Sequence, residues 1–222
     1  MTISVKSVVR AADGTVTVRC RLHSEQSADV RQYSKTHSEA VVFSFIYELY
    51  PALPEINSTI STEEYDAMES ASKVTYAIKK ASSILAYGAN SKAMLVLKLK
   101  RRGIDTDTAH QATDYLKRHG YLNESNDIER VVDRCLAKKW GPLRIVGYLK
   151  SKGYDAGSII TAKEILSNEN FPERCARLII SEYGTPPYAR EAKNKMISSL
   201  LRRGYASGDI NHALTIIENN SE

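Results

Sequence analysis

The amino-acid sequence predicts a mainly α-helical protein. It is expected to consist of tandem three-helix repeats that form an elongated, curved rod, preceded by a small α+β extension with a β-hairpin. Three observations support this fold class. After residue 61, apolar residues recur at spacings of three or four, as on the buried face of a helix. A helical segment that ends in glycine occurs three times, since Gly103, Gly153 and Gly204 lie 50 and then 51 residues apart. Before residue 61, short runs alternate with a period of two or are rich in β-branched residues, which is typical of strands.

The first 60 residues are predicted to be β-rich. Residues 3–9 and 15–22 are separated by Asp13-Gly14, a pair that is typical of hairpin turns. Residues 41–46 predict a further strand, which follows a polar stretch over residues 24–38. The strand after the turn alternates with period two and so places four side chains on one face: Val16, Val18, Cys20 and Leu22.

A long amphipathic helix is predicted over residues 61–87, as a lead-in to the repeats. Ser61 and Glu64 have the spacing of a capping box, in which each side chain accepts a hydrogen bond from the backbone amide of the other residue. Gly88 follows and is a natural place for the helix to end. Six apolar residues recur on one face: Met68, Ala71, Val74, Ile78, Ala81 and Leu85.

The repeat becomes visible when residues 94–105, 144–155 and 195–206 are aligned without a gap. Equivalent positions remain apolar on both sides of the glycine. Because a unit of about fifty residues has a thin core, neighbouring units are expected to stack on one another. We therefore divide the chain into a β-rich extension (1–60), the lead-in helix (61–87), two three-helix repeats (88–140 and 141–185) and a truncated third repeat (186–222).

The residues around each repeated glycine explain why the first helix of each repeat ends there. Glycine adopts a left-handed conformation at a helix end without a steric penalty, and Lys or Arg in the last turn complements the helix dipole. Asp105 and Asp155 are expected to cap the second helices, and Ser207 or Asp209 would do so in the third repeat. Third helices are expected over residues 124–139 and 172–183.

Positive charge is concentrated in the repeats. The chain has a net charge of +5, of which residues 1–86 contribute −1 (nine Lys and Arg, ten Asp and Glu) and residues 87–222 contribute +6 (22 and 16). A basic helical surface is typical of proteins that bind nucleic acid or an acidic protein partner. The alternative is a solvated helical face without a partner.

The sequence contains no pattern for catalysis, metal binding or a cofactor. It lacks the glycine-rich phosphate-binding motifs and the nucleophile motif of hydrolases. Cys20, Cys135 and Cys175 lie far apart, and the five His are scattered, so metal-ligand spacing is absent. No signal sequence or membrane-spanning apolar run is found. We expect a cytoplasmic protein that is not an enzyme, needs no cofactor and does not contact a membrane.

The candidate binding residues are cations, most of them at the ends of the first helices. Compensation of the helix dipole explains one or two cations at each end. A set that recurs with every repeat also suits a periodic anionic partner. The candidate partner-binding or DNA-binding residues are Lys98, Lys100, Arg101, Arg102, Lys117, Arg118, Arg144, Lys150, Lys152, Arg202 and Arg203.

Two aromatic residues occupy similar positions near the ends of the third helices. Trp140 precedes Gly141, and Tyr183 precedes Gly184. We interpret the two rings as equivalent residues that pack between repeats. Stacking on a nucleic-acid base is the alternative.

Three runs of the sequence carry a family pattern: Leu95-x-x-x-Leu99-Lys100-Arg101-Arg102-Gly103-Ile104, Tyr115-Leu116-Lys117-Arg118-His119-Gly120-Tyr121-Leu122, and the segment from Gly141 to Gly153. These runs resemble the RecX family, whose members regulate the RecA recombinase. The acidic pair that follows Tyr-Leu in the family is Asn123-Glu124 in this chain.

The resemblance implies tandem three-helix repeats and a monomeric, non-enzymatic modulator. It implies that the chain lies in the groove of the RecA filament on single-stranded DNA, with or without direct contact to the nucleic acid. There it would inhibit filament extension, ATP hydrolysis and strand exchange. The residues leave open an alternative function, a general DNA- or RNA-binding helical module that acts without RecA.

Overall fold

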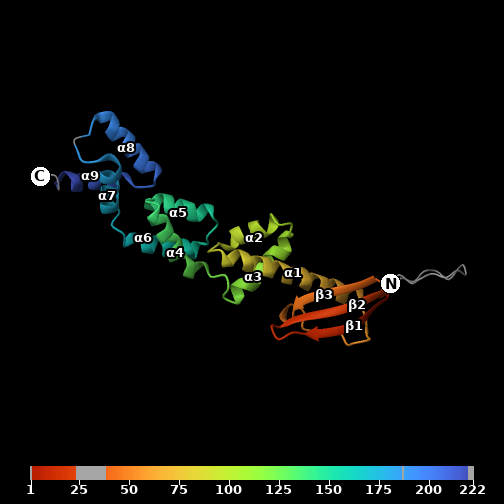
Figure 1. Ribbon diagram of the computed structural model, residues 1–222. Coiled ribbons are helices and arrows are strands. Elements are labelled where there is room, and N and C mark those ends of the chain that lie inside the picture. The colour runs from red at the N-terminus through yellow and green to blue at the C-terminus, as the bar shows by residue number, and fades with distance from the viewer. Residues whose placement is uncertain (1, 24–38, 187, 220–222) are drawn as a thin grey trace, which may run out of the picture. The chain divides into compact units, whose positions relative to one another are not determined.

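The computed structural model describes residues 2–23, 39–186 and 188–219, so the polar stretch over residues 24–38 lies outside the described residues. Within these ranges the chain forms nine α-helices and one four-stranded antiparallel sheet (Figure 1). The predicted mainly α-helical class with a small α+β extension is confirmed. The chain divides into two compact units. The first comprises residues 1–86 and 96–121, and the second comprises residues 87–95 and 122–222.

The sheet of the first unit contains the predicted hairpin. Between its first two strands, Gly14 has a φ of +79° and the Asp13 carboxylate accepts a hydrogen bond from the Thr15 amide at 2.9 Å. The predicted alternation is also confirmed, because Val16 and Val18 are fully buried. The strand order is β3-β2-β1-β4, and the strands are β1 (Thr2–Arg10), β2 (Thr15–His23), β3 (Glu39–Ile46) and β4 (Thr59–Ile60).

Helix α1 (Thr62–Ala86) begins with the predicted capping box. The Glu64 amide donates to Ser61 Oγ at 3.2 Å, and the Ser61 amide donates to Glu64 Oε2 at 2.7 Å. Since both amides lie at a helix start, where no carbonyl of the same helix is available, the reciprocal bonds stabilise the end of the helix.

The same helix also protects the edge of the sheet. The Ser44 amide of β3 donates to Ser72 Oγ at 3.2 Å, and the Ile46 amide donates to Thr75 Oγ1 at 3.0 Å. Unpaired edge amides invite pairing with another chain. Side chains of α1 therefore satisfy part of an edge strand that the sheet itself leaves open.

The repeat region forms the remaining helices, and their predicted caps are largely confirmed. Asp105 accepts from the Thr108 amide and Asp155 from the Ser158 amide, both at 2.8 Å. In the third repeat the side chain involved is Asp209, which accepts from the Ala206 amide at 3.3 Å. The helices are α2 (Lys92–Lys100), α3 (Thr106–Arg118), α4 (Glu124–Ala137), α5 (Pro142–Ser151), α6 (Ala156–Ser167), α7 (Phe171–Tyr183), α8 (Arg190–Arg202) and α9 (Ser207–Asn219).

Helices on either side of each predicted repeat boundary pack on one another. In the first unit α1 packs on α3, and in the second unit α4 packs on α6 and α7 packs on α9. Each pair joins the last helix before a repeat to the second helix of that repeat. The repeat boundaries at residues 88, 141 and 186 remain a prediction about the sequence. None of the helices in the described ranges is long and apolar enough to cross a membrane.

The leucine four residues before each repeated glycine is part of the core. Leu99 and Leu149 are fully buried. We predict that Leu149→Ala lowers the free energy of unfolding by about 2–5 kcal/mol, as expected for a buried leucine that leaves a cavity. Leu143 on the same helix is 64% exposed and is the matched control. Leu143→Ala should change the free energy by less than about 0.5 kcal/mol. Urea unfolding measures both, and equal effects would contradict the assignment of Leu149 to the core.

Candidate partner-binding surface

The first helices of the three repeats, α2, α5 and α8, end in the same hydrogen-bonded turn. After α2, the Gly103 amide donates to the Lys100 carbonyl at 3.0 Å and the Ile104 amide donates to the Leu99 carbonyl at 3.2 Å. The same two bonds recur after α5 and α8. The φ values of Gly103, Gly153 and Gly204 are +82°, +70° and +89°, as a Schellman motif requires. The predicted helix ends are confirmed.

In the second unit, the N-terminus of α5 is bonded to the C-terminal end of α8. The Gly141 amide donates to the Arg203 carbonyl at 2.8 Å, and the Leu143 amide donates to the Gly204 carbonyl at 3.1 Å. Amides at a helix start and carbonyls at a helix end have no partners inside their own helices. The two helix dipoles also meet with opposite partial charges. We call this contact the α5–α8 joint.

The joint depends on glycine on both sides. A Cβ atom at Gly141 would lie 2.4 Å from backbone atoms of Gly204 and Tyr205. A Cβ atom at Gly204 would lie 2.3 Å from the Arg144 amide nitrogen. At these distances the backbones would have to separate, so the close approach explains Gly141, whose own φ of −82° any residue can adopt.

A related contact joins the N-terminus of α2 to the end of α5. Ser91 Oγ donates to the Lys152 carbonyl and accepts from the Met94 amide at 3.1 Å. A Cβ atom at Gly153 would lie 2.6 Å from the Cβ atom of Ala93. The second contact therefore uses a serine side chain where the first uses backbone amides.

The buried carboxylate of Glu124 reinforces this second contact. It accepts from the Lys92 amide at 2.6 Å and from the Asp155 amide at 3.1 Å, and the residue is only 7% exposed. It thereby bonds the first residue of α2 and the residue before α6. Sequence reasoning missed this role, and its one available signal was the acidic residue next to Asn123.

The predicted cations of the first unit lie at the ends of α2 and α3. Lys100, Arg101 and Arg102 are exposed, whereas Lys98 is half-buried and has an interaction partner. Lys117 and Arg118, in the last turn of α3, are also exposed. Compensation of the α2 dipole accounts for one or two of the four cations at its end, so the exposed group exceeds that need.

The predicted cations of the second unit divide into two kinds. Lys150 and Arg202 are exposed, whereas Arg203 forms an ion pair with Glu182 at 2.9 Å. Arg144 Nη1 lies 3.4 Å from the Arg202 carbonyl, so the α5–α8 joint brings these two residues together. Because that joint already satisfies carbonyls at the end of α8, the Arg202 charge is not required to offset the helix dipole.

Aromatic rings position two further predicted cations. The Arg144 guanidinium lies 4.4 Å from the centroid of the Trp140 ring, and Lys152 Nζ lies 5.5 Å from that of Tyr148. The two rings pack edge to face, with centroids 5.4 Å apart. Cation–π contacts hold such side chains in place while leaving them charged.

The proposed equivalence of Trp140 and Tyr183 is wrong. The left-handed residue at the end of α7 is Gly184, with φ +78°, but the one at the end of α4 is Lys139, with φ +59°. Trp140 therefore follows the helix stop, whereas Tyr183 precedes it. Each ring is followed by a glycine, but the two glycines are not equivalent. Gly184 ends α7, whereas Gly141 belongs to the α5–α8 joint and does not end a helix.

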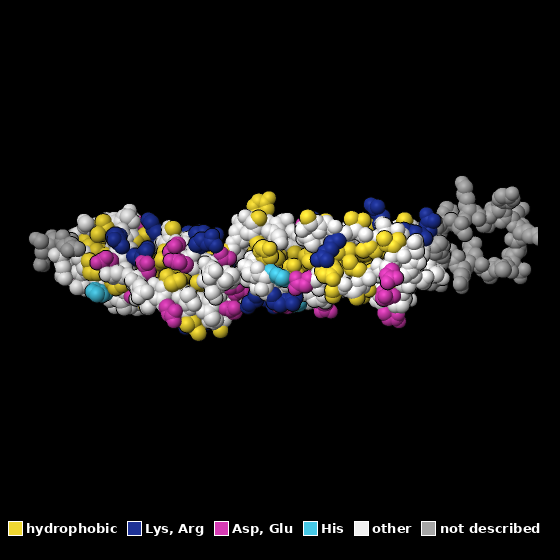
Figure 2. All heavy atoms as spheres, turned by 90° about the horizontal axis from the view of Figure 1, so that it is seen from below, with side chains coloured by type: hydrophobic (Ala, Val, Ile, Leu, Met, Phe, Trp, Pro, Cys, Tyr) yellow, Lys and Arg dark blue, Asp and Glu magenta, His cyan; other side chains and the backbone are white. Residues whose placement is uncertain are grey.

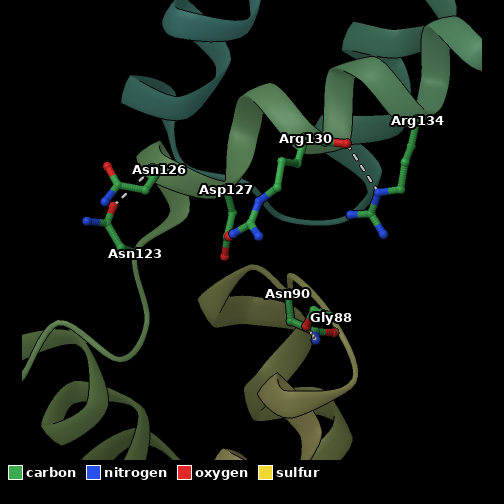
Figure 3. Close-up of polar contacts among 7 residues, drawn as sticks. All are labelled: Gly88, Asn90, Asn123, Asn126, Asp127, Arg130 and Arg134. Atoms are coloured by element: carbon green, nitrogen blue, oxygen red, sulfur yellow. Dashed lines mark hydrogen bonds and ion pairs between the residues drawn. The ribbon is translucent and has the colours of Figure 1, made fainter.

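A row of cations on α4 was not predicted. Arg130, Arg134 and Lys138 recur at every fourth residue, and this spacing places them on one face of a helix. Figure 3 shows Arg130 turned toward Asp127, with which it forms an ion pair. Arg134 Nε donates to the Arg130 carbonyl at 3.2 Å. On the face drawn in Figure 2, Lys and Arg side chains gather in small groups among acidic and apolar ones.

The described residues contain no cluster of three metal-ligating side chains.

Several known proteins with a similar sequence or fold are named RecX. A regulatory protein RecX from Xanthomonas oryzae pv. oryzae is 28% identical over 137 residues, which are 61% of this chain and 85% of that protein. A regulatory protein RecX from Stenotrophomonas maltophilia is 25% identical over 137 residues, 61% and 83% of the two chains. A crystal structure of regulatory protein RecX covers 95% of this chain and 98% of its own, with a TM-score of 0.68 and 13% identity. The chain is therefore similar in sequence and in fold to proteins named RecX.

A second RecX structure confirms the fold over a smaller part of the chain. RecX from Lactobacillus salivarius covers 66% of this chain and 97% of its own, with a TM-score of 0.55 and 21% identity. The first RecX structure leaves only 5% of this chain uncovered, so most of the N-terminal sheet has a counterpart there. No protein-family model matches the chain.

The α5–α8 joint predicts an unusual response to adding one methyl group. We expect Gly141→Ala to lower the free energy of unfolding by about 1–3 kcal/mol, since the new Cβ atom would overlap the backbone after α8. Thermal and urea unfolding measure the loss.

Gly147 is the matched control for this substitution. It lies in the middle of α5, and a Cβ atom there would meet no atom within 4 Å. Gly147→Ala should therefore raise stability by about 0.5–1 kcal/mol, as expected for an exposed helical glycine. A gain of stability in both variants would show that α5 and α8 are not in close contact.

Proposed function

We propose that this chain regulates the RecA recombinase by binding the RecA filament on single-stranded DNA and inhibiting filament extension, ATP hydrolysis and strand exchange. The observation that carries the proposal is the sequence similarity between this chain and proteins named regulatory protein RecX. We further propose that the chain acts as a cytoplasmic monomer, without catalysis of its own.

The charge distribution supports a binding role of this kind. Exposed cations lie at the ends of α2 and α3 in the first unit and at the ends of α5 and α8 in the second. Each group is carried by a turn with a fixed backbone, because the same two hydrogen bonds close the ends of α2, α3, α5 and α8. Repeated cations on rigid ends suit a filament, whose anionic surfaces also repeat.

Several weak contacts would suffice for such a partner. An exposed ion pair contributes only about 0–1 kcal/mol. If one chain engages a filament through several helix ends at once, the later contacts form at a high effective concentration. The proposal therefore requires no single dominant binding residue.

The exposed group at the end of α2 provides the test. We predict that Lys100→Gln, Arg101→Gln and Arg102→Gln combined raise the concentration that half-inhibits RecA ATPase on single-stranded DNA by about tenfold, the effect of losing roughly 1.4 kcal/mol of binding. Circular dichroism should remain unchanged, because all three side chains are exposed. Lys98 is left intact because it is half-buried and has a partner.

The matched control removes the same charge elsewhere in the same unit. Lys6, Arg19 and Arg21 are exposed on the sheet, and their replacement by Gln should leave the inhibition unchanged. Equal losses of inhibition in the two triple variants would show that inhibition depends on net charge and not on the position of the cations. If the wild-type chain at stoichiometric amounts leaves RecA ATPase and strand exchange unchanged, the proposed function is wrong. Equally tight binding to naked and RecA-coated DNA would favour a general nucleic-acid-binding module.

A further inference from the structure

Lys139 occupies a backbone position that glycine fills at four other helix ends in the described part of the chain. At the end of α4 the Lys139 amide donates to the Leu136 carbonyl at 2.9 Å, and the Trp140 amide donates to the Cys135 carbonyl at 3.3 Å. The same pair of bonds closes four other helices of this chain, and the left-handed residue there is Gly103, Gly120, Gly153 or Gly204. At the end of α4 that residue is a lysine with φ +59°.

The turn itself does not call for a lysine. A side chain in the left-handed region is disfavoured by contact with its own backbone, and glycine avoids this. Nor does the helix dipole explain it, because Arg134 lies in the last turn of α4 and Lys138 is its C-cap, with a regular φ of −80°. Strained residues of this kind cluster at binding sites, which makes the Lys139 side chain a candidate ligand-binding group.

Lys139 lines a pocket of about 300 Å³ in the second unit. Two further cations line it, Arg174 and Arg177 of α7, together with Ser181 and the buried Tyr205. No Asp or Glu is among the lining residues. Three positive charges therefore surround a small pocket whose remaining walls are uncharged.

Most of this charge is not neutralised within the described part of the chain. Lys139 and Arg177 form no ion pair or side-chain hydrogen bond there. Arg174 uses Nε to bind Glu169 at 2.6 Å, which leaves the donors on its two terminal nitrogens for another partner. A pocket with this surplus has to be matched by an anion or by solvent.

Tyr205 contributes a neutral side chain to the lining of the pocket. Tyr205 is only 2% exposed, and this burial raises the pKa of its hydroxyl. The hydroxyl therefore stays protonated at neutral pH. Arg174 and Arg203 lie close enough to the hydroxyl to act on it in the opposite direction.

We propose that this pocket binds a phosphate group, held by Lys139, Arg174 and Arg177. Arginine forms paired hydrogen bonds to phosphate oxygens, and lysine adds a point charge. A free phosphate carries about 1.5 to 2 negative charges, which offset most of the charge of Lys139 and Arg177, because Arg174 is already paired with Glu169. The phosphate belongs either to a free anion or to a nucleic-acid backbone, whose phosphodiester carries one negative charge. The same donors would bind its oxygens in both cases.

The test titrates the full-length protein with inorganic phosphate at constant ionic strength and follows the ¹H–¹⁵N signals of the arginine Nε–H groups and of the Ser181 amide. The wild-type signals should shift and saturate. Lys139→Gly should weaken phosphate binding about tenfold or more, the effect of losing one hydrogen bond to a charged group. It should also raise the unfolding temperature by up to about 4 °C, because glycine relieves the left-handed strain.

Two comparisons decide the result. Arg177→Gln should weaken phosphate binding as Lys139→Gly does, whereas Lys138→Gln, which removes the neighbouring charge from a residue outside the pocket, should not. Signals that never saturate, or equal losses in Lys139→Gly and Lys138→Gln, would overturn the proposal.

A thymidine oligonucleotide identifies the source of the phosphate. Displacement of bound inorganic phosphate by the oligonucleotide, with lower oligonucleotide affinity in Lys139→Gly, supports a nucleic-acid backbone. Persistence of the phosphate signals in excess oligonucleotide supports a free anion. Because RecA is absent from the assay, the outcome does not depend on the proposed regulation of RecA.

Discussion

The second unit depends on a contact in which one helix begins where another ends. At the α5–α8 joint, the free amides at the start of α5 bond the free carbonyls after α8. Each group would otherwise lack a partner in its own helix. Backbones can approach this closely only because Gly141 and Gly204 carry no side chain. The contact between Ser91 and the end of α5 repeats the arrangement with a hydroxyl group. A helix end in this fold therefore serves both as the stop of one element and as the seat of the next.

This constraint separates the cations that the fold needs from those that it does not. Arg203 is drawn into an ion pair with Glu182, and Arg144 packs on Trp140 while reaching the carbonyl of Arg202. Arg202 and Lys150 extend from helix ends that are already bonded to another helix. Their charge is thus available to a partner, as is that of the exposed residues after α2. The same comparison isolates Lys139, since every structural need at the end of α4 would be met by glycine.

The sequence predicted local structure far better than contacts between distant segments. Gly103, Gly153 and Gly204 were recognised as helix ends because a left-handed residue leaves a strong local signal, and the capping box was read from two residues. The role of Gly141 could not be predicted, because the atoms that exclude a Cβ atom there belong to a turn more than sixty residues away. Glu124 and the Glu182 partner of Arg203 were missed for the same reason. The row of cations on α4, by contrast, was visible in the spacing and was overlooked.

Amide hydrogen exchange at the start of α5 tests the central claim most directly. First-turn amides normally exchange quickly, since they lack partners in their own helix. The α5–α8 joint predicts that the amides of Gly141 and Leu143 are protected to the same degree as the core amide of Leu149. The amides of Arg190 and Glu191 at the start of α8, where Ala189 provides no side-chain cap, should exchange much faster. Exchange of Gly141 and Leu143 at the rate of Glu191 would contradict the joint.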